Sequence, residues 1–172
     1  MKVFKTKFKG LLILKQNNFI DKRGNLRVTF IEKKLKKKFI FEYCTISKRN
    51  VLRGFHFQSK FKQSKFVNVV KGKILDVVVD CRKDSKTFGK HFAIELSQKN
   101  SKSIYIPPGF IHGFLGKEKE NIVVYSCSNY RNKNSEIGVL WNDKKLNIDW
   151  KIKKPIISKK DKKNISFDNL KI

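Results

Sequence analysis

The stretch IPPGFIHGF, residues 106–114, decides the fold of this chain. Its Pro-Pro-Gly turn ends one apolar segment and reverses the chain into a second one, which is typical of two antiparallel strands. Outward from this turn in both directions, apolar residues recur at every second position between turn signals, whereas helical periodicity is nearly absent. The stretch and its surroundings therefore predict an all-β chain.

Eight segments of the chain have the alternating pattern and the length of short strands. They are residues 11–14, 25–31, 39–46, 66–70, 73–80, 92–96, 103–106 and 121–127. Many short strands joined by turns predict a β-sandwich or jelly roll, and the 15 phenylalanines suit an interior that two sheets fill together. The lysine-rich run 32–38 predicts a short exposed helix. We expect one domain over residues 1–172, with the lysine-rich segment 151–172 packing on it.

The composition limits the class of protein. Lysine and arginine number 41 against 14 acidic residues, a net charge of +27, which favours anionic partners. The lysines are spread along the whole chain without a nucleic-acid recognition motif, so the charge indicates a basic surface rather than a nucleic-acid site. No apolar run approaches the roughly 18 residues of a membrane helix, and no signal-peptide pattern begins the chain, so we expect a cytoplasmic protein without a membrane partner. Three scattered cysteines predict reduced thiols.

Two of the three histidines stand in unusual contexts. His56 lies in an apolar segment where Arg53 and Gln58 are expected to share its strand face, and His112 follows the Pro-Pro-Gly turn. His91, at the expected start of a strand, is interpreted as a surface residue. A lone histidine is most often structural, but two of them in apolar strands, with Arg, Lys and Gln beside them, favour a polar cavity.

Residues 54–56 and 107–112 resemble the two half-motifs of a cupin barrel. Cupins usually hold a metal through three histidines and one glutamate. Here Gln58 stands where a second histidine would complete the first half-motif, and Lys65 arrives where a glutamate is expected. Since an ammonium group is a poor neighbour for a divalent ion, we predict no metal and no other cofactor. The resemblance implies a cupin jelly roll, or double-stranded β-helix, with short peripheral helices and a C-terminal tail.

More closely, the chain resembles the dTDP-4-dehydrorhamnose 3,5-epimerase family. The matching stretches follow the family's order and are residues 19–24, 52–58, 63–67, 72–82, 108–114, 141–143, 148–150 and 158–161. The resemblance implies an isomerase of deoxysugar synthesis for surface polysaccharide, which inverts C3 and C5 of a 4-keto-6-deoxyhexose carried on a nucleoside diphosphate. Both carbons flank the ketone, so each inversion needs a base, an acid on the opposite face and a cation at the enolate oxygen.

The resemblance assigns these roles to particular residues. His56 matches the base, and Asp161 matches the carboxylate that orients its ring and stabilises the imidazolium. Tyr125 matches the proton donor on the opposite face. Lys65 is expected at the C4 oxygen of the sugar, supported by His112.

Further matching residues are expected to bind the substrate. They are Phe19 and Trp141 as pocket walls, Arg23, Arg53 and Lys160 at phosphate and sugar, and Gln58, Glu136, Tyr130 and Arg131 elsewhere in the site. For Phe19 and Trp141, packing in the core is the alternative. In the family, the segment that carries Arg23 crosses to the partner subunit. The resemblance therefore implies a homodimer in which this segment completes the site of the partner.

The chain departs from the family pattern where the nucleotide and the substrate are recognised. A second tyrosine is expected six residues after the proton donor, and Arg131 stands there with Tyr130 beside it. Val28 stands where the family has a glutamate, and residues 41–43 are Phe-Glu-Tyr where the family has Gln-x-Asn. An arginine plane can also stack on a base. The sequence thus defines the reaction class more firmly than the nucleotide base or the sugar.

Three alternatives stay open on the sequence. A related 4-keto-sugar mono-epimerase or ketoisomerase, acting on another nucleotide, would differ in which carbons exchange protons. A non-catalytic basic cupin that binds nucleic acid or another anion would show salt-dependent binding and indifference to His56→Ala. A metal-dependent cupin oxygenase would carry metal when purified, and the missing ligands argue against it.

Overall fold

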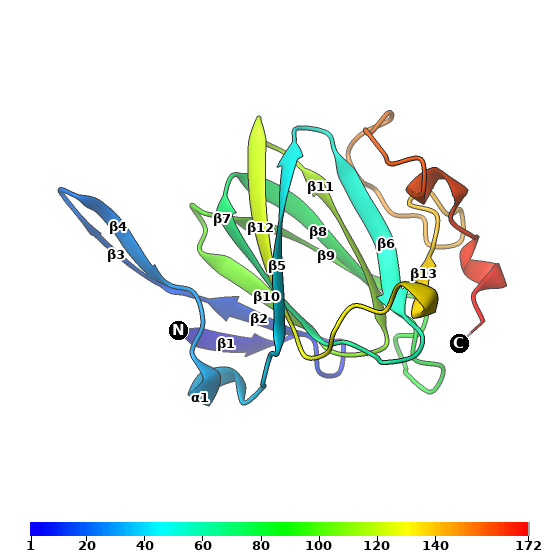
Figure 1. The fold of residues 1–172 in the computed structure, drawn as a ribbon, viewed down its shortest axis with the longest axis horizontal. Coiled ribbons are helices and arrows are strands. Elements are labelled where there is room, and N and C mark those ends of the chain that lie inside the picture. Colours follow the sequence, from blue (N-terminus) through cyan, green and yellow to red (C-terminus); the bar gives the residue numbers. More distant parts are fainter. Residues whose placement is uncertain (172) are drawn as a thin grey trace.

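Two antiparallel sheets stacked on each other form the body of the molecule in a computed structural model that describes residues 1–171 (Figure 1). One sheet has six strands in the order β1-β2-β10-β7-β12-β5, and the other has five in the order β13-β6-β11-β8-β9. The strands are β1 (Lys2–Lys5), β2 (Leu12–Lys15), β3 (Asn17–Asp21), β4 (Gly24–Val28), β5 (Phe41–Lys48), β6 (Leu52–Gln58), β7 (Lys65–Lys71), β8 (Lys73–Asp80), β9 (His91–Ser97), β10 (Lys102–Ile106), β11 (Phe110–Gly116), β12 (Glu120–Cys127) and β13 (Glu136–Gly138). The short helical elements are α1 (Glu32–Leu35), η1 (Lys133–Ser135), η2 (Asp161–Lys163) and η3 (Phe167–Asn169).

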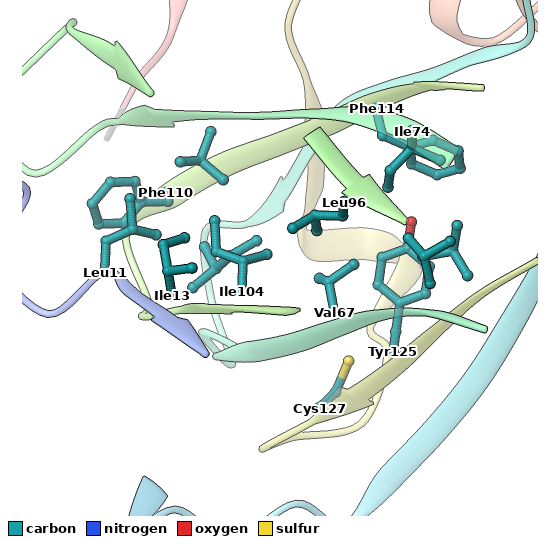
Figure 2. Close-up of a cluster of buried hydrophobic side chains, with 14 of the residues drawn as sticks. Leu11, Ile13, Val67, Ile74, Leu96, Ile104, Phe110, Phe114, Tyr125 and Cys127 are labelled. Carbon is teal, nitrogen blue, oxygen red and sulfur yellow. The ribbon is translucent and has the colours of Figure 1, made fainter. Parts of the chain in front are cut away.

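Apolar side chains from both sheets fill the space between them (Figure 2). Alternation along each strand sends every second side chain inward, and burial of these side chains is the main driving force for the sandwich. Leu11 and Phe110 lie at one end of the cluster, and Phe114 and Tyr125 lie at the other (Figure 2). Tyr125 brings a hydroxyl group into this otherwise apolar end, and the polar site begins beside it.

The C-terminal part of the chain covers the outer face of the five-stranded sheet. Trp150 packs on Phe55 of β6 with ring centroids 5.3 Å apart, within a second buried cluster. Ile156 also forms a parallel bridge with Val51 next to the start of β6. Because both of its faces are covered, β11 is buried along its whole length.

The hairpin β3–β4 projects from the body of the molecule (Figure 1). Its apolar side chains are open to solvent, with Phe19 58% exposed, Ile20 77% and Leu26 64%. An isolated two-stranded hairpin is marginally stable in water, and a cluster of exposed apolar side chains is typical of a surface that contacts another chain. The hairpin therefore has the composition of a contact surface.

The all-β prediction is confirmed, and all eight predicted strands are present. The predicted segment 73–80 coincides with β8. Five strands lie outside the eight predicted segments, namely β1, β3, β6, β11 and β13. Every residue of β1 and β3 is exposed, so these two have no buried face for alternation to reveal. The predicted helix 32–38 is shorter than expected, because Lys36 takes a left-handed conformation with φ of 54° that ends α1 after Leu35, which is buried rather than exposed.

The helical elements in residues 1–171 are all too short or too polar to cross a membrane.

Candidate active site

A polar cavity of about 620 Å³ lies between the two sheets, at the Tyr125 end of the apolar interior. Strands β5, β7 and β12 line it from one sheet, β6, β11 and β13 from the other, and residues 156–161 of the C-terminal segment complete its wall. The predicted site residues that it brings together are Arg53, His56, Gln58, Lys65, His112, Tyr125, Arg131, Glu136, Lys160 and Asp161. A cavity of this size with several converging polar groups is suited to a small-molecule ligand.

Two glycines allow the histidine-bearing strands to approach closely. A Cβ on Gly54 would lie 2.6 Å from the Cα of Gly113, and a Cβ on Gly113 would lie 2.8 Å from the carbonyl oxygen of Arg53. His56 of β6 and His112 of β11 are direct register partners across this contact. The register shifts directly after His112, and this irregularity allows Arg53 and His56, three residues apart, to line the same cavity.

His56 is paired with a carboxylate from the C-terminal segment. Its Nε2 lies 2.6 Å from Oδ1 of Asp161, and the side chains are 30% and 6% exposed. Burial by itself raises the pKa of Asp161, but hydrogen bonds to His56 and Ser158 outweigh it and hold the pKa below its ordinary value of 3.8. An ionised carboxylate can only accept, so Nε2 of His56 carries the shared proton and donates it. Nδ1 is then the ring nitrogen with a free lone pair.

His112 is paired with a second carboxylate, which lies deep in the sheet. Its Nε2 is 2.8 Å from Oδ2 of Asp76 on β8, and the two side chains are 4% and 0% exposed. The other oxygen of Asp76, Oδ1, is buried without a hydrogen-bond partner among the described residues. Asp76 was not predicted as a site residue. A carboxylate flanked by apolar residues in the middle of a predicted strand is the signal that identifies it.

Lys65 of β7 lines the cavity from the six-stranded sheet. None of the ion pairs formed within residues 1–171 involves its ammonium group. Burial lowers the pKa of Lys65, and the charges of Cys127, Glu136 and Asp76 partly oppose this effect. A partly buried cation without a close counter-ion is placed to stabilise an anion that arrives with, or develops on, a ligand.

Tyr125 of β12 brings a phenol to the same cavity. Its ring stacks on Tyr43 of β5, with centroids 4.7 Å apart and planes 6° from parallel, and His112 meets it edge-on at 5.9 Å. Burial, followed by the charges of Tyr43 and Asp76, raises the pKa of Tyr125 well above 10.0. The phenol therefore stays protonated at neutral pH, which is the form that can donate a proton. No role was predicted for Tyr43.

A charged cluster lies in the wall of the cavity. Arg131 donates two hydrogen bonds to Glu136, at 2.8 and 3.0 Å, and Lys160 donates a third at 2.7 Å. The hydrogen bonds from Arg131, against the effect of burial and with help from Lys160, lower the pKa of Glu136 to about 2. Two cations around one carboxylate leave a net positive charge, which favours an anionic ligand group.

Arg53 and Gln58 have different local partners. The guanidinium of Arg53 donates from Nε to the hydroxyl of Ser47 at 2.9 Å and from Nη2 to the carbonyl of Ile46 at 3.2 Å. Gln58 donates to the carbonyl of Phe61 at 2.8 Å and accepts from the N–H of Asn132 at 2.7 Å. Its amide is therefore occupied in joining two loops beside the cavity.

Two predicted binding residues lie on the projecting hairpin. Phe19 is 58% exposed, and the side chain of Arg23 is 84% exposed. Arg23 is bound to Asp21 of the same hairpin at 2.6 Å. Neither residue lines the cavity of its own chain.

Tyr130 and Trp141 also lie outside the cavity. Tyr130 is 64% exposed, and its ring lies 6.1 Å from that of Phe41, which does line the cavity. Trp141 packs against the buried cluster on the outer face of the five-stranded sheet, where its carbonyl accepts a hydrogen bond from Trp150. The structure thus places Trp141 in the apolar packing of the C-terminal part rather than in the pocket wall.

The cavity offers a donor set for an anion rather than for a metal ion. No group of three His, Cys, Asp or Glu side chains gathers in a metal-binding arrangement within residues 1–171. His56 and His112 each use one ring nitrogen on a carboxylate, and Lys65 adds a positive charge to the same space. Divalent ions prefer anionic or lone-pair ligands without a cation among them.

The arrangement has the parts needed to move a proton at carbon. A base with a free lone pair, His56, and a protonated phenol, Tyr125, come from opposite sheets. The ammonium of Lys65 and the ring of His112 line the same space. Such a set can deprotonate a carbon on one face, stabilise the resulting enolate and reprotonate it on the other face.

Comparison with known proteins points to one family. The family model described as dTDP-4-dehydrorhamnose 3,5-epimerase matches residues 5–169. The dTDP-4-dehydrorhamnose 3,5-epimerase of Shigella flexneri is 39% identical over 168 residues, which cover 94% of this chain and 93% of the relative.

Solved structures give the same result. A dTDP-6-deoxy-D-glucose-3,5-epimerase from Legionella pneumophila, in complex with dTDP-4-keto-L-rhamnose, matches with a TM-score of 0.94 and 31% identity, covering 99% of this chain and 94% of that chain. A 3'-monoepimerase from Streptomyces bikiniensis, in complex with dTDP-quinovose, matches with a TM-score of 0.88 and 25% identity, covering 94% and 85%. The likeness over nearly the whole chain confirms the predicted jelly-roll fold.

Proposed function

The chain belongs to the dTDP-4-dehydrorhamnose 3,5-epimerase family, and we propose that its cavity inverts C3 and C5 of dTDP-4-dehydro-6-deoxy-D-glucose to give dTDP-4-dehydro-L-rhamnose. One observation carries the assignment of roles: the His56–Asp161 pair and the buried Tyr125 come from opposite sheets of a cavity that also holds Lys65. Inversion beside a ketone requires a base and an acid on opposite faces of the sugar, with a cation near the ketone oxygen.

His56 starts the reaction in this proposal. Its Nδ1 takes the proton from C5 or C3, and the electrons of that C–H bond move to the C4 oxygen to form an enolate. Asp161 stabilises the resulting imidazolium through the 2.6 Å contact. Tyr125 then gives its phenolic proton to the same carbon from the opposite face, and the phenolate and the imidazolium return to their starting forms by proton exchange with solvent.

Lys65 and His112 stabilise the enolate. The ammonium of Lys65 lies without an ion pair of its own in the described chain, so a developing oxyanion supplies its missing counter-charge. His112 is held by the buried Asp76 and keeps a fixed ring orientation. Fixed dipoles and charges need little reorganisation as the negative charge forms, which is why they lower the barrier.

The basic groups of the cavity wall bind the diphosphate and sugar. Arg53, Arg131 and Lys160 all line the cavity, and two of them surround Glu136. An arginine fork can hold two phosphate oxygens at once, whereas a lysine acts as a point charge. The net charge of the chain, +27, attracts such an anion from solution. No nucleic-acid partner is needed to account for the charge.

A homodimer completes this proposal. The exposed Phe19 and Arg23 of the β3–β4 hairpin are open for contact with the cavity of a second copy. Exposed apolar residues on a projecting hairpin support a partner-covered surface. We also propose that residues 1–172 act as one unit, since Asp161 of the C-terminal segment is bonded to His56 of the sheet. A cytoplasmic location stays a prediction.

Proton NMR of the purified protein with dTDP-4-dehydro-6-deoxy-D-glucose in D₂O tests the proposal. Deuterium entering at both C3 and C5, with formation of the L-rhamno product, is the expected result. No exchange at either carbon, with this or another nucleotide base, would contradict the epimerase and favour an anion-binding protein.

Mono-epimerisation is the second candidate. It is favoured by the residues that depart from the family pattern in the cavity wall, namely Phe41, Tyr43 and Arg131. The structural likeness to a 3'-monoepimerase is compatible with it. Deuterium at C3 alone, or at C5 alone, in the same NMR experiment would select this candidate over the double epimerase.

A further inference from the structure

Strand β5 turns three side chains toward the cavity. Phe41, Tyr43 and Thr45 line it, whereas the alternate residues Glu42, Cys44 and Ile46 are exposed on the outer side. β5 is the last strand of the six-stranded sheet, and it pairs with β12 on its inner edge. None of the catalytic or binding roles proposed above involves these three side chains.

Tyr43 lies directly against the proposed proton donor. The two residues are register partners on β5 and β12, and their rings stack 4.7 Å apart within 6° of parallel. The ring of His112 meets another side of Tyr125 at 5.9 Å, and Phe114 lies at 6.5 Å. Tyr43 is therefore the neighbour that packs in parallel against one face of the Tyr125 ring.

We propose that Tyr43 is a positioning residue, which holds the Tyr125 ring in the orientation that delivers a proton to the enolate. The inference rests on the proposed epimerisation. A tyrosine ring can rotate about two side-chain torsions, and parallel stacking on a large flat neighbour restricts that rotation. The stack also excludes water from one face of the ring, which limits contact of the phenol with water rather than with the substrate.

The fate of the enolate reports on this orientation. After His56 has removed the proton, the enolate takes a proton either from Tyr125 on the new face or from His56 on the old face. His56 is 30% exposed, so its imidazolium proton exchanges with solvent before some of these returns. In D₂O the second route gives unchanged substrate that carries deuterium, and the first gives inverted product.

The experiment measures the ratio of deuterated, uninverted substrate to inverted product by NMR at low conversion. Tyr43→Leu and Tyr43→Asn remove the stack, and we expect this ratio to rise at least about tenfold, because delivery of the proton from Tyr125 is slowed while removal by His56 continues. Tyr43→Phe keeps the ring, so its ratio is expected to stay within about twofold of wild type. Cys44→Ser, on the exposed side of the same strand, is the matched control.

The outcomes separate this inference from the function on which it rests. Absence of exchange in the wild-type protein would overturn the epimerase itself. Normal wild-type exchange with an unchanged ratio in folded Tyr43→Leu and Tyr43→Asn proteins would overturn the positioning role alone. A Tyr43→Phe ratio as high as that of Tyr43→Leu would also overturn it, since the hydroxyl group rather than the stack would then be responsible. Thermal melting checks that each variant is folded, and if Tyr43→Leu does not fold, the ratios of Tyr43→Asn and Tyr43→Phe decide.

Discussion

The two histidine–carboxylate pairs of the cavity are alike in length and opposite in setting. His56–Asp161 spans 2.6 Å and joins the sheet to the C-terminal segment, whereas His112–Asp76 spans 2.8 Å between neighbouring strands of one sheet. The side chain of His56 is 30% exposed and that of His112 is 4% exposed. The same contact therefore supports two uses: the open pair can pass protons to substrate and solvent, while the closed pair fixes a ring.

The largest expected effect comes from removing the open histidine. His56→Ala should lower turnover by roughly 1,000-fold or more, because the base is lost, while the dissociation constant of dTDP changes little since the basic groups of the wall remain. Turnover is measured by the NMR assay and binding by calorimetry. His91→Ala, at an exposed histidine, is the control and should keep the wild-type rate. A near-normal rate in His56→Ala would break the comparison, because the open pair would then have no part in the chemistry.

Removal of the charge in the open pair should have a smaller effect on the rate. Asp161→Asn still accepts a hydrogen bond from His56 but stabilises the imidazolium less, so turnover should fall roughly 100-fold. The free energy of unfolding should change by less than about 1 kcal/mol, since the contact is kept. Asp149→Asn, at an acidic residue that contacts Lys151, controls for loss of a negative charge in the same segment. A large loss of stability without loss of rate would show that Asp161 is structural.

The closed pair should respond in the opposite way. Asp76→Asn weakens a fully buried hydrogen bond, and the free energy of unfolding should fall by roughly 1–3 kcal/mol in urea titrations. Turnover should fall only several-fold, because His112 then loses orientation but no proton-transfer group is removed. Asp84→Asn, at an exposed carboxylate, is the control. Equal effects of Asp76→Asn and Asp161→Asn on both rate and stability would erase the distinction between the pairs.

Glu136, the carboxylate of the charged cluster, is expected to have the smallest effect, a pH-dependent contribution to the free energy of unfolding. The pKa of Glu136 is lowered from 4.5 to about 2 by Arg131 and Lys160, so its contacts stabilise the fold above pH 4.5 and are lost as pH falls toward 2. Because the two cations are half exposed, solvent screening reduces the contribution to about 1 kcal/mol. The difference in unfolding free energy between wild type and Glu136→Gln should therefore shrink between pH 6 and pH 3. Parallel stability curves for the two proteins would contradict this.

Alternation predicted the strands that have one buried and one exposed face. β5 alternates between partly buried and exposed residues over most of its length, and the pattern is visible in the sequence. β11 is buried throughout, because the C-terminal segment covers its outer face, and only the Pro-Pro-Gly turn before it indicated a strand. β1 and β3 are exposed throughout and have no pattern at all. In β1, β3 and β11, periodicity gives no signal because both faces of the strand have the same surroundings.

The catalytic candidates were predicted from motifs, and their partners depend on contacts that spacing does not show. His56 and Asp161 are separated by 105 positions and meet only because the C-terminal segment folds back over β6. The stack of Tyr43 on Tyr125 depends on the register of β5 and β12, which a single sequence does not define. Trp141 was expected in the pocket wall or in the core, and it packs against the apolar cluster on the outer face of the five-stranded sheet.

The position of Asp161 also bears on how the protein is handled. Its carboxylate sits in a segment whose exposed lysines include Lys153, Lys154, Lys159 and Lys160. Trypsin can cut after Lys153, Lys159 and Lys160, whereas Pro155 blocks the bond after Lys154. A single cut there breaks the covalent link between the partner of His56 and the strands that carry the rest of the cavity. Limited proteolysis would therefore silence the enzyme while most of its β-structure persists, and circular dichroism alone would report an intact protein.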